Sequence, residues 1–480
     1  MFWGHKSILV SFFLIIAAHL LHAQDVVSGK YDNLPQVQLL SKYVQYPSYS
    51  GQEYSAGKFF MNACKEKGLH VEVFTDTGGS INFAASLYPL DTKKPNIVLH
   101  HHIDVVEEGT HENWKYPPFS GTIADGYVWG RGALDIKGMG VMHLFALASF
   151  VEMADTMDLP YNFTLLAVSG EETGGHLGAA IIVEHFAERL NPVLVLGEGG
   201  SGASDLLMAT PERPYFGISI AEKVSLWLRL SINMETLAHG SVTPGEYPVQ
   251  VMINALTRID KRIPQIKFNK ASRRMFRELG KIERGPRGFL LQNINWLIFR
   301  PLVAQYFLGD PNLYALTTNT ITITSICTPE LDHNQIAQSV EATLDCRLIT
   351  SSDKDDLLKE IKELIRDPRI KIEVVEKGSR SYISTPEKYY NLMSDAIKSF
   401  YPKSVVVPIF FPASTDNNYF RGLGIPVYGI NPFIKNKELL NSIHNYNERM
   451  PVEGLIQGQK VYELFIQKVI KAHGKDDTQN

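Results

Sequence analysis

The sequence predicts an α/β fold: a mostly parallel sheet in a larger domain, with a smaller α+β sandwich inserted into it. Four apolar runs are continuous rather than alternating, which is typical of strands covered on both faces. They lie near residues 97–102, 163–170, 192–199 and 425–432, with helical patterns between them. From about Gly217 to Gly378, alternating runs and an amphipathic helix replace this pattern, which indicates the inserted sandwich.

The length leaves room for these parts. The chain has 480 residues, 44% hydrophobic and 20% charged, which suits two or three domains that each bury a core. We expect the larger domain at 24–217 and again at 378–475, with the insert at 218–377.

Extra helical sequence lengthens the insert, and its apolar stretch at 288–309 could span a bilayer by length alone. Its polar side chains and proline favour a helix packed on the insert.

The first residues have the layout of a secretory signal. A short cationic start, an apolar run from Ile8 to Leu21 and a small residue at Ala23 predict a signal peptide at 1–23. The alternative is an uncleaved membrane anchor, but the apolar run is shorter than the roughly 20 residues that cross a bilayer. We therefore expect an exported protein, periplasmic or extracellular, with no stable membrane span after signal cleavage.

Charge and cysteine content narrow the function further. A formal net charge of −4, from 47 basic and 51 acidic residues, creates no field that would attract polyanions, so no nucleic-acid partner is expected. Cys64, Cys327 and Cys346 are odd in number and widely spaced. We expect them to be small buried hydrophobic side chains, with at most one disulfide among them.

Acidic and imidazole side chains follow the apolar runs. They are His102, Asp104, Asp135, Glu171, Glu172, Glu198 and, much later, His444. Ligands bind outside the carboxyl ends of parallel strands, so these groups are expected to converge. Each alone has an ordinary structural explanation, such as a turn aspartate beside glycines. Together they are buried carboxylates with few arginines beside them, and such groups need a counter-charge that metal ions would supply.

The ligand types indicate the metal. Two imidazoles with three carboxylates suit two Zn²⁺ ions that share one carboxylate, with Co²⁺ or Mn²⁺ as substitutes, whereas Ca²⁺ and Mg²⁺ prefer oxygen alone. Asp104 would leave the strand on the same face as His102 and accept a hydrogen bond from its second ring nitrogen. This favours His102 as the ligand among three consecutive histidines and leaves His100 and His101 structural.

The motifs that carry these residues resemble a family of co-catalytic di-zinc peptidases. The family includes aminoacylase, acetylornithine deacetylase, succinyl-diaminopimelate desuccinylase, glutamate carboxypeptidase and carboxypeptidase S. In chain order the motifs are HIDVV, PPFSG, DGYVWGRGALDIKG, SGEETGG, GEGG, LAHGSVTP, NQIAQSVEATLDCR, STDNNYF and HNYNE. They cover nearly all of the chain after the signal. The resemblance implies a catalytic domain that carries a lid, with a homodimer formed through that lid.

The resemblance also implies a division of the metal ligands. His102, Asp135 and Glu198 would hold one zinc ion, and Asp135, Glu172 and His444 the other. Asp135 would thus be the shared carboxylate.

Further roles follow from the same resemblance. Glu171 would be the general base that takes a proton from the attacking water and passes it to the leaving amine. His239 would stabilise the oxyanion of the tetrahedral intermediate, and Arg347 would bind the free carboxylate of the substrate. Asn334 and Ser414 would be further substrate contacts. The alternative for His239 and Arg347 is that both are ordinary polar residues on the surface of the insert.

Departures from the family pattern bear on the substrate. The family commonly has two glycines where this chain has Pro412 and Ala413, which would narrow the floor of the substrate site. The long insert resembles that of carboxypeptidase S and of fatty-acyl amino acid hydrolases. We expect a zinc-dependent hydrolase that cleaves an amide or peptide bond next to an amino acid with a free carboxylate, as a carboxypeptidase or dipeptidase. The alternative is an aminoacylase-like N-acyl amino acid amidohydrolase.

Two readings from other classes compete with hydrolysis. A secreted binding protein could retain a peptidase fold, but such relatives usually lose ligands or the base, and all of those positions are filled in this chain. GEGGSG at 197–202 matches the GxGxxG pattern of dinucleotide-binding proteins. There Glu198 would push a carboxylate against the pyrophosphate, and the following segment, with two prolines, does not open a helix.

Overall fold

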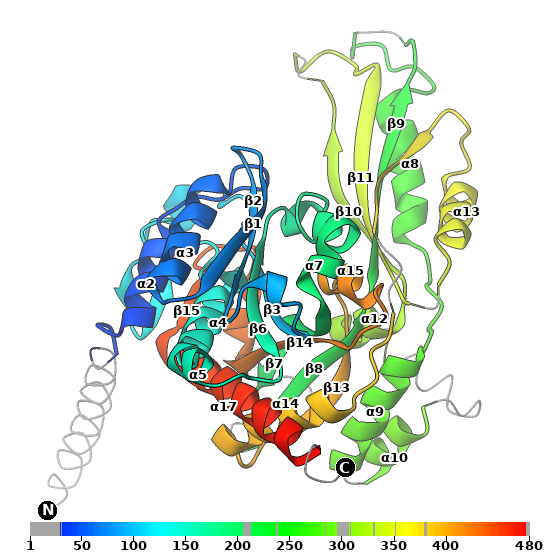
Figure 1. Ribbon diagram of the computed structural model, residues 1–480. Helices are drawn as coiled ribbons and strands as arrows, with labels where there is room; N and C mark the ends of the chain where they lie inside the picture. The colour runs from blue at the N-terminus through cyan, green and yellow to red at the C-terminus, as the bar shows by residue number, and fades with distance from the viewer. Residues whose placement is uncertain are drawn as a thin grey trace, which may run out of the picture. The chain divides into compact units, whose positions relative to one another are not determined.

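The computed structural model describes most of the chain after the expected signal (Figure 1). The described residues are 29, 31–204, 213–236, 239–283, 285–294, 307, 309–329, 332–350, 352–378 and 382–476. The predicted signal peptide at 1–23 lies outside them.

A mixed eight-stranded sheet, in the order β1-β2-β6-β3-β7-β14-β8-β13, is the largest element of the structure. Its strands are β1 (His70–Asp76), β2 (Ile81–Ser86), β3 (Asn96–His102), β6 (Asn162–Val168), β7 (Pro192–Ala203), β8 (Tyr215–Glu222), β13 (Val405–Phe411) and β14 (Val427–Lys435). Strand β3 pairs in parallel with β6 and β7. The β1–β2, β2–β6, β7–β8 and β14–β8 pairs are antiparallel. The predicted α/β class is confirmed, with the parallel strands in the middle of the sheet.

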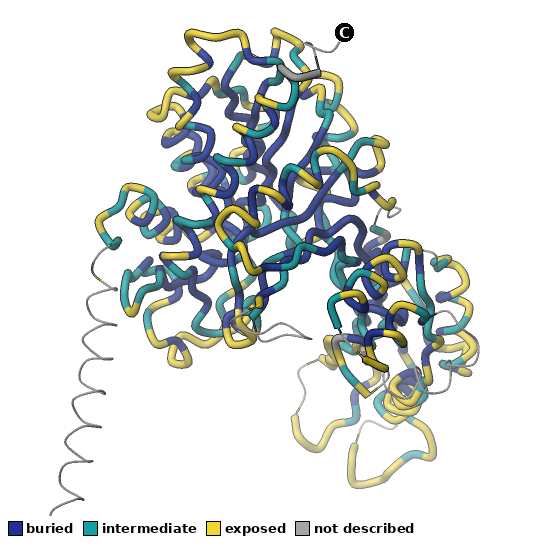
Figure 2. The backbone as a smooth tube through the Cα atoms, turned by 90° about the horizontal axis from the view of Figure 1, so that it is seen from below, coloured by how far each residue is buried: buried dark blue, intermediate teal, exposed yellow. Residues whose placement is uncertain are grey.

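The central strands are buried on both faces, which explains their continuous apolar sequences. Every residue of β3 and of β6 is buried. Figure 2 shows the same distinction along the backbone, with buried segments in dark blue and exposed connections in yellow. A small three-stranded sheet, ordered β15-β5-β4, adds β4 (Ile123–Ala124), β5 (Tyr127–Trp129) and β15 (Arg449–Pro451).

Helices from both ends of the chain pack on and around this sheet. They are α2 (Pro35–Val44), α3 (Tyr54–Glu66), α4 (Gly138–Ala148), α5 (Val151–Thr156), α6 (Ala179–Ile181), α7 (Ala187–Leu190), α14 (Lys388–Phe400), α16 (Lys437–Asn441) and α17 (Val452–Asp476). Helix α4 contacts β3, β6, α2 and α17, whereas α3 contacts β1 and β2. Among the described residues, only the helical stretch Ala133–Thr156 is long and apolar enough to cross a membrane. It contains α4, and 72% of its apolar window is buried, as in a core helix.

The inserted region has its own sheet and core. Strands β9 (Val224–Asn233), β10 (Thr320–Cys327), β11 (Ser339–Leu348) and β12 (Lys371–Lys377) form an antiparallel sheet in the order β10-β11-β9-β12. Along β9, Leu226, Leu228 and Leu230 are buried and alternate with partly exposed residues. Helices α8 (Pro248–Asp260) and α13 (Lys354–Ile365) complete the apolar cluster. The predicted alternation and amphipathic helix are therefore present.

Shorter helices occupy the extra sequence of the insert. They are α9 (Lys270–Ile282), α10 (Pro286–Gln292) and α12 (Pro311–Thr317), and α9 contacts α10. The stretch at 288–309 is predicted to be one helix. Its start, 288–292, is helical as part of α10, but this helix ends at Gln292, so the prediction of one continuous helix is wrong. The Asn293 side chain bonds back to the Phe289 carbonyl at 2.8 Å, as a residue that terminates a helix often does. Residues 295–306 lie outside the described residues.

The chain divides into two compact units. One comprises 1–216, 387–406 and 430–480, and the other comprises 217–386 and 407–429. The segment 407–429, which we expected in the larger domain, is grouped by its contacts with the insert and contains the short helix α15 (Asn417–Arg421). All three cysteines are free, and Cys64 and Cys346 are buried as predicted. The prediction is wrong for Cys327, which lies exposed at the end of edge strand β10.

Candidate metal centre

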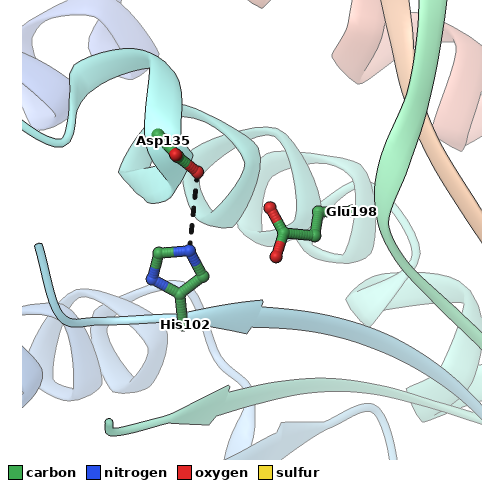
Figure 3. A group of neighbouring side chains, drawn as sticks. All are labelled: His102, Asp135 and Glu198. Carbon is green, nitrogen blue, oxygen red and sulfur yellow. Dashed lines mark ion pairs between the residues drawn. The ribbon is translucent and has the colours of Figure 1, made fainter. Parts of the chain in front are cut away.

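Strand β3 ends in the first candidate ligand. His102 is its last residue, and its imidazole is 1% exposed. Asp135 lies in the helical turn Ala133–Lys137, where the backbone at Asp135 and Ile136 leaves the helical conformation and their peptide bond is cis. The Nε2 atom of His102 lies 3.5 Å from Oδ1 of Asp135, and Figure 3 shows the two side chains facing each other with Glu198 beside them. Ligand atoms of these three residues lie within 4.8 Å of one another.

The second oxygen of Asp135 faces another imidazole. His444 Nε2 lies 3.1 Å from Asp135 Oδ2 and 3.1 Å from Glu172 Oε1. The backbone of His444 has φ +57°, in the left-handed region that is uncommon for non-glycine residues, although Asn, Asp and His are enriched there. Asp135 therefore presents one oxygen to His102 and the other to His444.

Both glutamates of the SGEETGG motif come to the same place. They follow β6 in a short helical turn, Glu171–Thr173, which Gly170 enters at φ +75°. Ligand atoms of His102, Glu171 and Glu172 lie within 4.8 Å of one another. The structure thus gathers all five predicted metal ligands and the predicted base, and every one of them belongs to a single compact unit.

The role predicted for Asp104 is partly corrected. His102 Nδ1 lies 2.9 Å from the backbone carbonyl of Asp104 and 3.5 Å from its carboxylate oxygen Oδ1, so the backbone oxygen is the closer acceptor. The carboxylate instead accepts hydrogen bonds from the backbone N–H groups of Glu171 (3.1 Å) and Glu172 (3.0 Å). The Ser50 hydroxyl donates to it at 2.6 Å. Asp104 therefore holds the glutamate turn as well as the imidazole.

The pKa values show how strongly these groups interact. Burial disfavours the charged form of His102, but the Asp104 and Asp135 carboxylates outweigh it and raise its pKa well above the usual value. The same contacts with His102 and His444 overcome burial at Asp135 and hold its pKa far below its usual value. Hydrogen bonds to Asp135 and Glu172 raise the pKa of His444 to about 10. Burial, reinforced by the charge of Asp135, raises the pKa of Glu172.

The donor set fits divalent metal ions. Among the described residues, the four carboxylates of Asp135, Glu171, Glu172 and Glu198 gather with two imidazoles, and carboxylates brought together out of water need counter-charge. Two groups of potential metal ligands, His102–Asp135–Glu198 and Asp135–Glu172–His444, have only Asp135 in common. Mixed nitrogen and oxygen donors of this kind suit zinc and its close substitutes.

The other two histidines of the HHH run lie elsewhere. His100 and His101 are both buried, and neither belongs to the groups of potential ligands found among the described residues. The His101 ring packs edge-on against Phe60 and His143. A side chain at Gly140 would place its Cβ 2.5 Å from the His101 ring, so this imidazole fills space above the glycine. Its role is packing.

The other predicted site residues all belong to the second compact unit, where they make three separate sets of contacts. His239 is exposed, its Nδ1 accepts from Ser241, and the neighbouring Gly240 N–H donates to the Asn334 carbonyl at 2.7 Å. Arg347 donates through Nε to both oxygens of Asp345, at 2.8 and 3.1 Å. The Ser414 hydroxyl accepts from Asn418 at 3.2 Å.

Comparison with known proteins identifies the family of this chain. Residues 98–468 match the family described as peptidase family M20/M25/M40. The chain belongs to this family. It is 28% identical over 389 residues to a probable carboxypeptidase S-like 2 of Dictyostelium discoideum, covering 80% of this chain and 73% of that one. It is 27% identical over 391 residues to the N-fatty-acyl-amino acid synthase/hydrolase PM20D1 of Mus musculus, covering 79% and 76%.

A solved structure agrees with this assignment at the level of the fold. The M20 family metallo-carboxypeptidase Sso-CP2 of Sulfolobus solfataricus superposes with a TM-score of 0.68 at 19% identity, covering 91% of this chain and 99% of that one. This M20 peptidase is therefore a metal-dependent hydrolase of the metallopeptidase and amidohydrolase type, built on the α/β fold with an inserted domain.

Two buried residues of this M20 peptidase support the centre without having been predicted to do so. Glu448 is 0% exposed and pairs with Arg131 at 2.6 Å. Its carboxylate also accepts hydrogen bonds from the backbone N–H groups of Leu134 (3.0 Å) and Asp135 (3.1 Å). Both residues stand inside quoted motifs, HNYNE and GRGALDIKG, but nothing local in the sequence pairs them.

The backbone at 197–202 does not have the conformation of a dinucleotide-binding site, which the GxGxxG match had suggested as an alternative. Strand β7 runs without a break through GEGGSG to Ala203, where it pairs with β8. The glycine loop and following helix N-terminus that would hold a pyrophosphate are therefore not formed at 197–202.

Proposed function

We propose that this M20 peptidase is an exported two-zinc hydrolase that cleaves an amide or peptide bond next to an amino acid with a free carboxylate. The observation that carries the proposal is Asp135, whose two oxygens face His102 and His444 separately. A carboxylate shared in this way suits two adjacent ions better than one. In this proposal His102, Asp135 and Glu198 hold one zinc ion, and Asp135, Glu172 and His444 hold the other.

The protein's own groups then divide the work. When bound, the zinc ions supply Lewis acidity that polarises the scissile carbonyl and makes water more acidic. Glu171 is next in the chain to the ligand Glu172, and in this proposal its carboxylate accepts the proton of the attacking water and returns it to the leaving amine. Asp104 fixes the turn that carries Glu171. His239 stabilises the oxyanion, and Arg347 binds the substrate carboxylate, with Asn334 and Ser414 as further contacts.

Two panels of substrates test the proposal. Purified protein loaded with zinc would be assayed against dipeptides and against N-acyl amino acids of graded acyl length, with the zinc content measured per chain. We expect about two zinc ions per chain, hydrolysis of at least one panel, and loss of activity on chelation that zinc restores. An anomalous-scattering map without a metal peak between the imidazoles of His102 and His444 would contradict the proposal.

The relatives favour a second candidate within the same chemistry. The relative from Mus musculus is the N-fatty-acyl-amino acid synthase/hydrolase PM20D1, and the relative from Dictyostelium discoideum is a probable carboxypeptidase S-like 2. The candidate substrate is therefore an N-acyl amino acid with a long chain. A kcat/KM that rises with acyl length, together with inactivity on dipeptides, would select it over the dipeptidase.

Export and assembly complete the proposal. The cationic start and apolar run of the first residues support secretion. Amino-terminal sequencing of protein recovered outside the cytoplasm should begin at Gln24. We also propose a homodimer formed through the inserted domain, and light scattering would give its mass.

A further inference from the structure

Among the described residues, a buried lysine of the inserted region has no carboxylate in an ion pair with it. Lys223 lies between β8 and β9 and is 0% exposed. Within the described part of the chain its ammonium has one hydrogen-bond partner, the hydroxyl of Thr320 at 3.2 Å. A neutral hydroxyl satisfies one donor but does not compensate a buried charge, which is costly unless an anion accompanies it.

The charged neighbours of Lys223 do not supply that anion. Burial, followed by the charge of Arg347, lowers the pKa of Lys223 to about 7, and Asp345 opposes the shift. The Asp345 carboxylate is already occupied, because Arg347 Nε donates to both of its oxygens and Trp227 Nε1 donates to Oδ1 at 3.1 Å. Asp345 is thus the carboxylate near both Lys223 and Arg347, and its oxygens are bonded to Arg347.

The carboxylate nearest in sequence is committed as well. Glu222 pairs with Arg421 at 3.1 Å and accepts hydrogen bonds from the backbone N–H and hydroxyl of Thr415. Lys223, Arg347 and Asp345 together therefore carry one positive charge when the lysine is protonated. One carboxylate from a ligand would bring this group to neutrality.

The strand register gathers donors around that charge. Thr320 of β10 lies directly opposite Arg347 of β11, and Arg347 lies opposite Ser225 of β9, so these side chains share one face of the sheet. Lys223 reaches the same face through Thr320.

The backbone of Lys223 also holds the loop of another proposed substrate contact. Its N–H donates to the carbonyls of Phe411 (3.2 Å) and Ala413 (3.1 Å). The Asn418 side chain donates both to the Lys223 carbonyl, at 3.1 Å, and to the Ser414 hydroxyl, at 3.2 Å. Lys223 is thus built into the same group of residues as Ser414.

We propose that Lys223 is a second cation of the substrate-binding site, where it binds the free carboxylate of the substrate together with Arg347 while Thr320 donates its hydroxyl. The proposal rests on the proposed function, in which Arg347 contacts that carboxylate. It assigns Lys223 to recognition of the substrate and leaves bond cleavage to the metal centre.

Matched substrates and variants test it. The best substrate from the two panels would be compared with the same compound in which the carboxylate is converted to a carboxamide. Lys223→Met removes the charge at similar length, Lys223→Arg restores a cation, and Ser325→Ala on the exposed part of β10 is the control. We expect Lys223→Met to raise KM for the carboxylate by roughly 10- to 100-fold, the range for a lost charge-assisted hydrogen bond, and to leave the carboxamide almost unchanged. Lys223→Arg should recover part of the loss.

Two further measurements separate recognition from folding. A lysine that stabilises the fold would lower the Tm when replaced, whereas removal of an uncompensated buried charge is expected to leave the Tm of Lys223→Met equal or higher. Calorimetric titration of the metal-free full chain with N-acetyl-L-leucine and with N-acetyl-L-leucinamide measures binding without turnover. Binding of the carboxylate should weaken in Lys223→Met and remain in Ser325→Ala.

The outcomes distinguish the two proposals. If Arg347→Met raises KM for the carboxylate while Lys223→Met does not, the inference about Lys223 is wrong and the proposed function stands. Equal losses on the carboxylate and the carboxamide would also overturn it, because they indicate a structural role. If the zinc-loaded parent hydrolyses neither panel, the proposed function fails, and the titration alone then decides whether Lys223 binds carboxylates.

Discussion

Single residues at the metal centre combine unusual backbone positions with strong electrostatic coupling. His444 adopts a left-handed backbone conformation, and the contacts of its ring with Asp135 and Glu172 hold a proton on it. Glu171 is next in sequence to a ligand, and its backbone is fixed by Asp104. Substitution of these two residues can therefore test the proposed general base and the proposed metal ligand separately.

Replacement of Glu171 should separate catalysis from metal binding. We expect Glu171→Gln to lower kcat by roughly 10²- to 10⁴-fold, the usual loss for a general base, while the zinc content stays at the parent level. Glu172→Gln is the matched comparison, because we expect it to lose zinc. Steady-state kinetics and metal analysis of the two proteins measure both effects. A Glu171→Gln protein with nearly full activity would exclude Glu171 as the base.

Metal uptake should release protons, because the imidazole of His444 holds a proton in the metal-free protein. The pKa of His444 is about 10, so its ring is protonated at neutral pH and must lose that proton to bind an ion. We expect the apparent zinc affinity to rise with pH up to about 10. Without metal, the contacts of protonated His444 stabilise the folded protein. This contribution to the free energy of unfolding is complete below pH 6.5, the ordinary pKa of histidine, and is lost as the pH rises through about 10.

Calorimetric zinc titrations in buffers of different ionisation enthalpy count the protons released. His444→Gln should release fewer protons than the parent, and His185→Gln, which changes an exposed histidine outside the centre, should match the parent. Equal counts in His444→Gln and the parent would show that His444 carries no proton before metal binds.

At the level of the elements, the turn Ala133–Lys137 is positioned from a distant part of the chain. Glu448 precedes β15, accepts two backbone hydrogen bonds from the turn and neutralises Arg131, so one carboxylate satisfies several buried groups. Strands β5 and β15 pair beside it, with Trp129 opposite Arg449. The location of Asp135 therefore depends on packing between the motif GRGALDIKG and the motif HNYNE.

Loss of the Glu448 charge should destabilise this arrangement. In Glu448→Gln, Arg131 remains buried without a counter-ion, and we expect the free energy of unfolding to fall by roughly 3–5 kcal/mol. Glu438→Gln is the control, because that side chain is exposed and its pair with Arg449 should contribute less than about 1 kcal/mol. Urea unfolding of the metal-free proteins compares the two variants. Similar losses in both would contradict the role assigned to Glu448.

Local sequence was sufficient for some elements and not for others. The continuous apolar runs predicted β3, β6 and β7 because strands buried on both faces need such residues along their length. The alternating leucines of β9 likewise predicted a strand with one buried face. The antiparallel β1–β2 edge has mostly exposed or partly exposed residues on β1, and its pairing left no comparable pattern.

Across the whole molecule, the sequence predicted the members of the candidate site better than their partners. Acidic residues and histidines at strand ends identify the potential ligands, because parallel strands bring their carboxyl ends together. The pairing of Arg131 with Glu448, 317 residues apart, comes from tertiary packing that residue spacing does not encode. The exposure of Cys327 likewise depends on β10 being an edge strand.

The two compact units should allow stability to be changed separately from the metal centre. Leu228 lies in the apolar cluster of the small sheet and is 1% exposed, whereas all the proposed ligands belong to the other unit. We expect Leu228→Ala to reduce the free energy of unfolding by roughly 2–5 kcal/mol without changing the zinc bound per folded chain. Arg229→Ala, on the exposed face of the same strand, is the control. Zinc loss in parallel with destabilisation would show that the units depend on each other.

The order of the ligands along the chain has a consequence during synthesis. Four of the proposed ligands occur by residue 198, but the fifth is His444, and Glu448, which holds the turn of Asp135, follows it. A nascent polypeptide interrupted before that point can form most of the central strands, yet it lacks the last imidazole. Such a fragment should remain inert, so hydrolytic competence arises only after the growing chain has extended past Glu448.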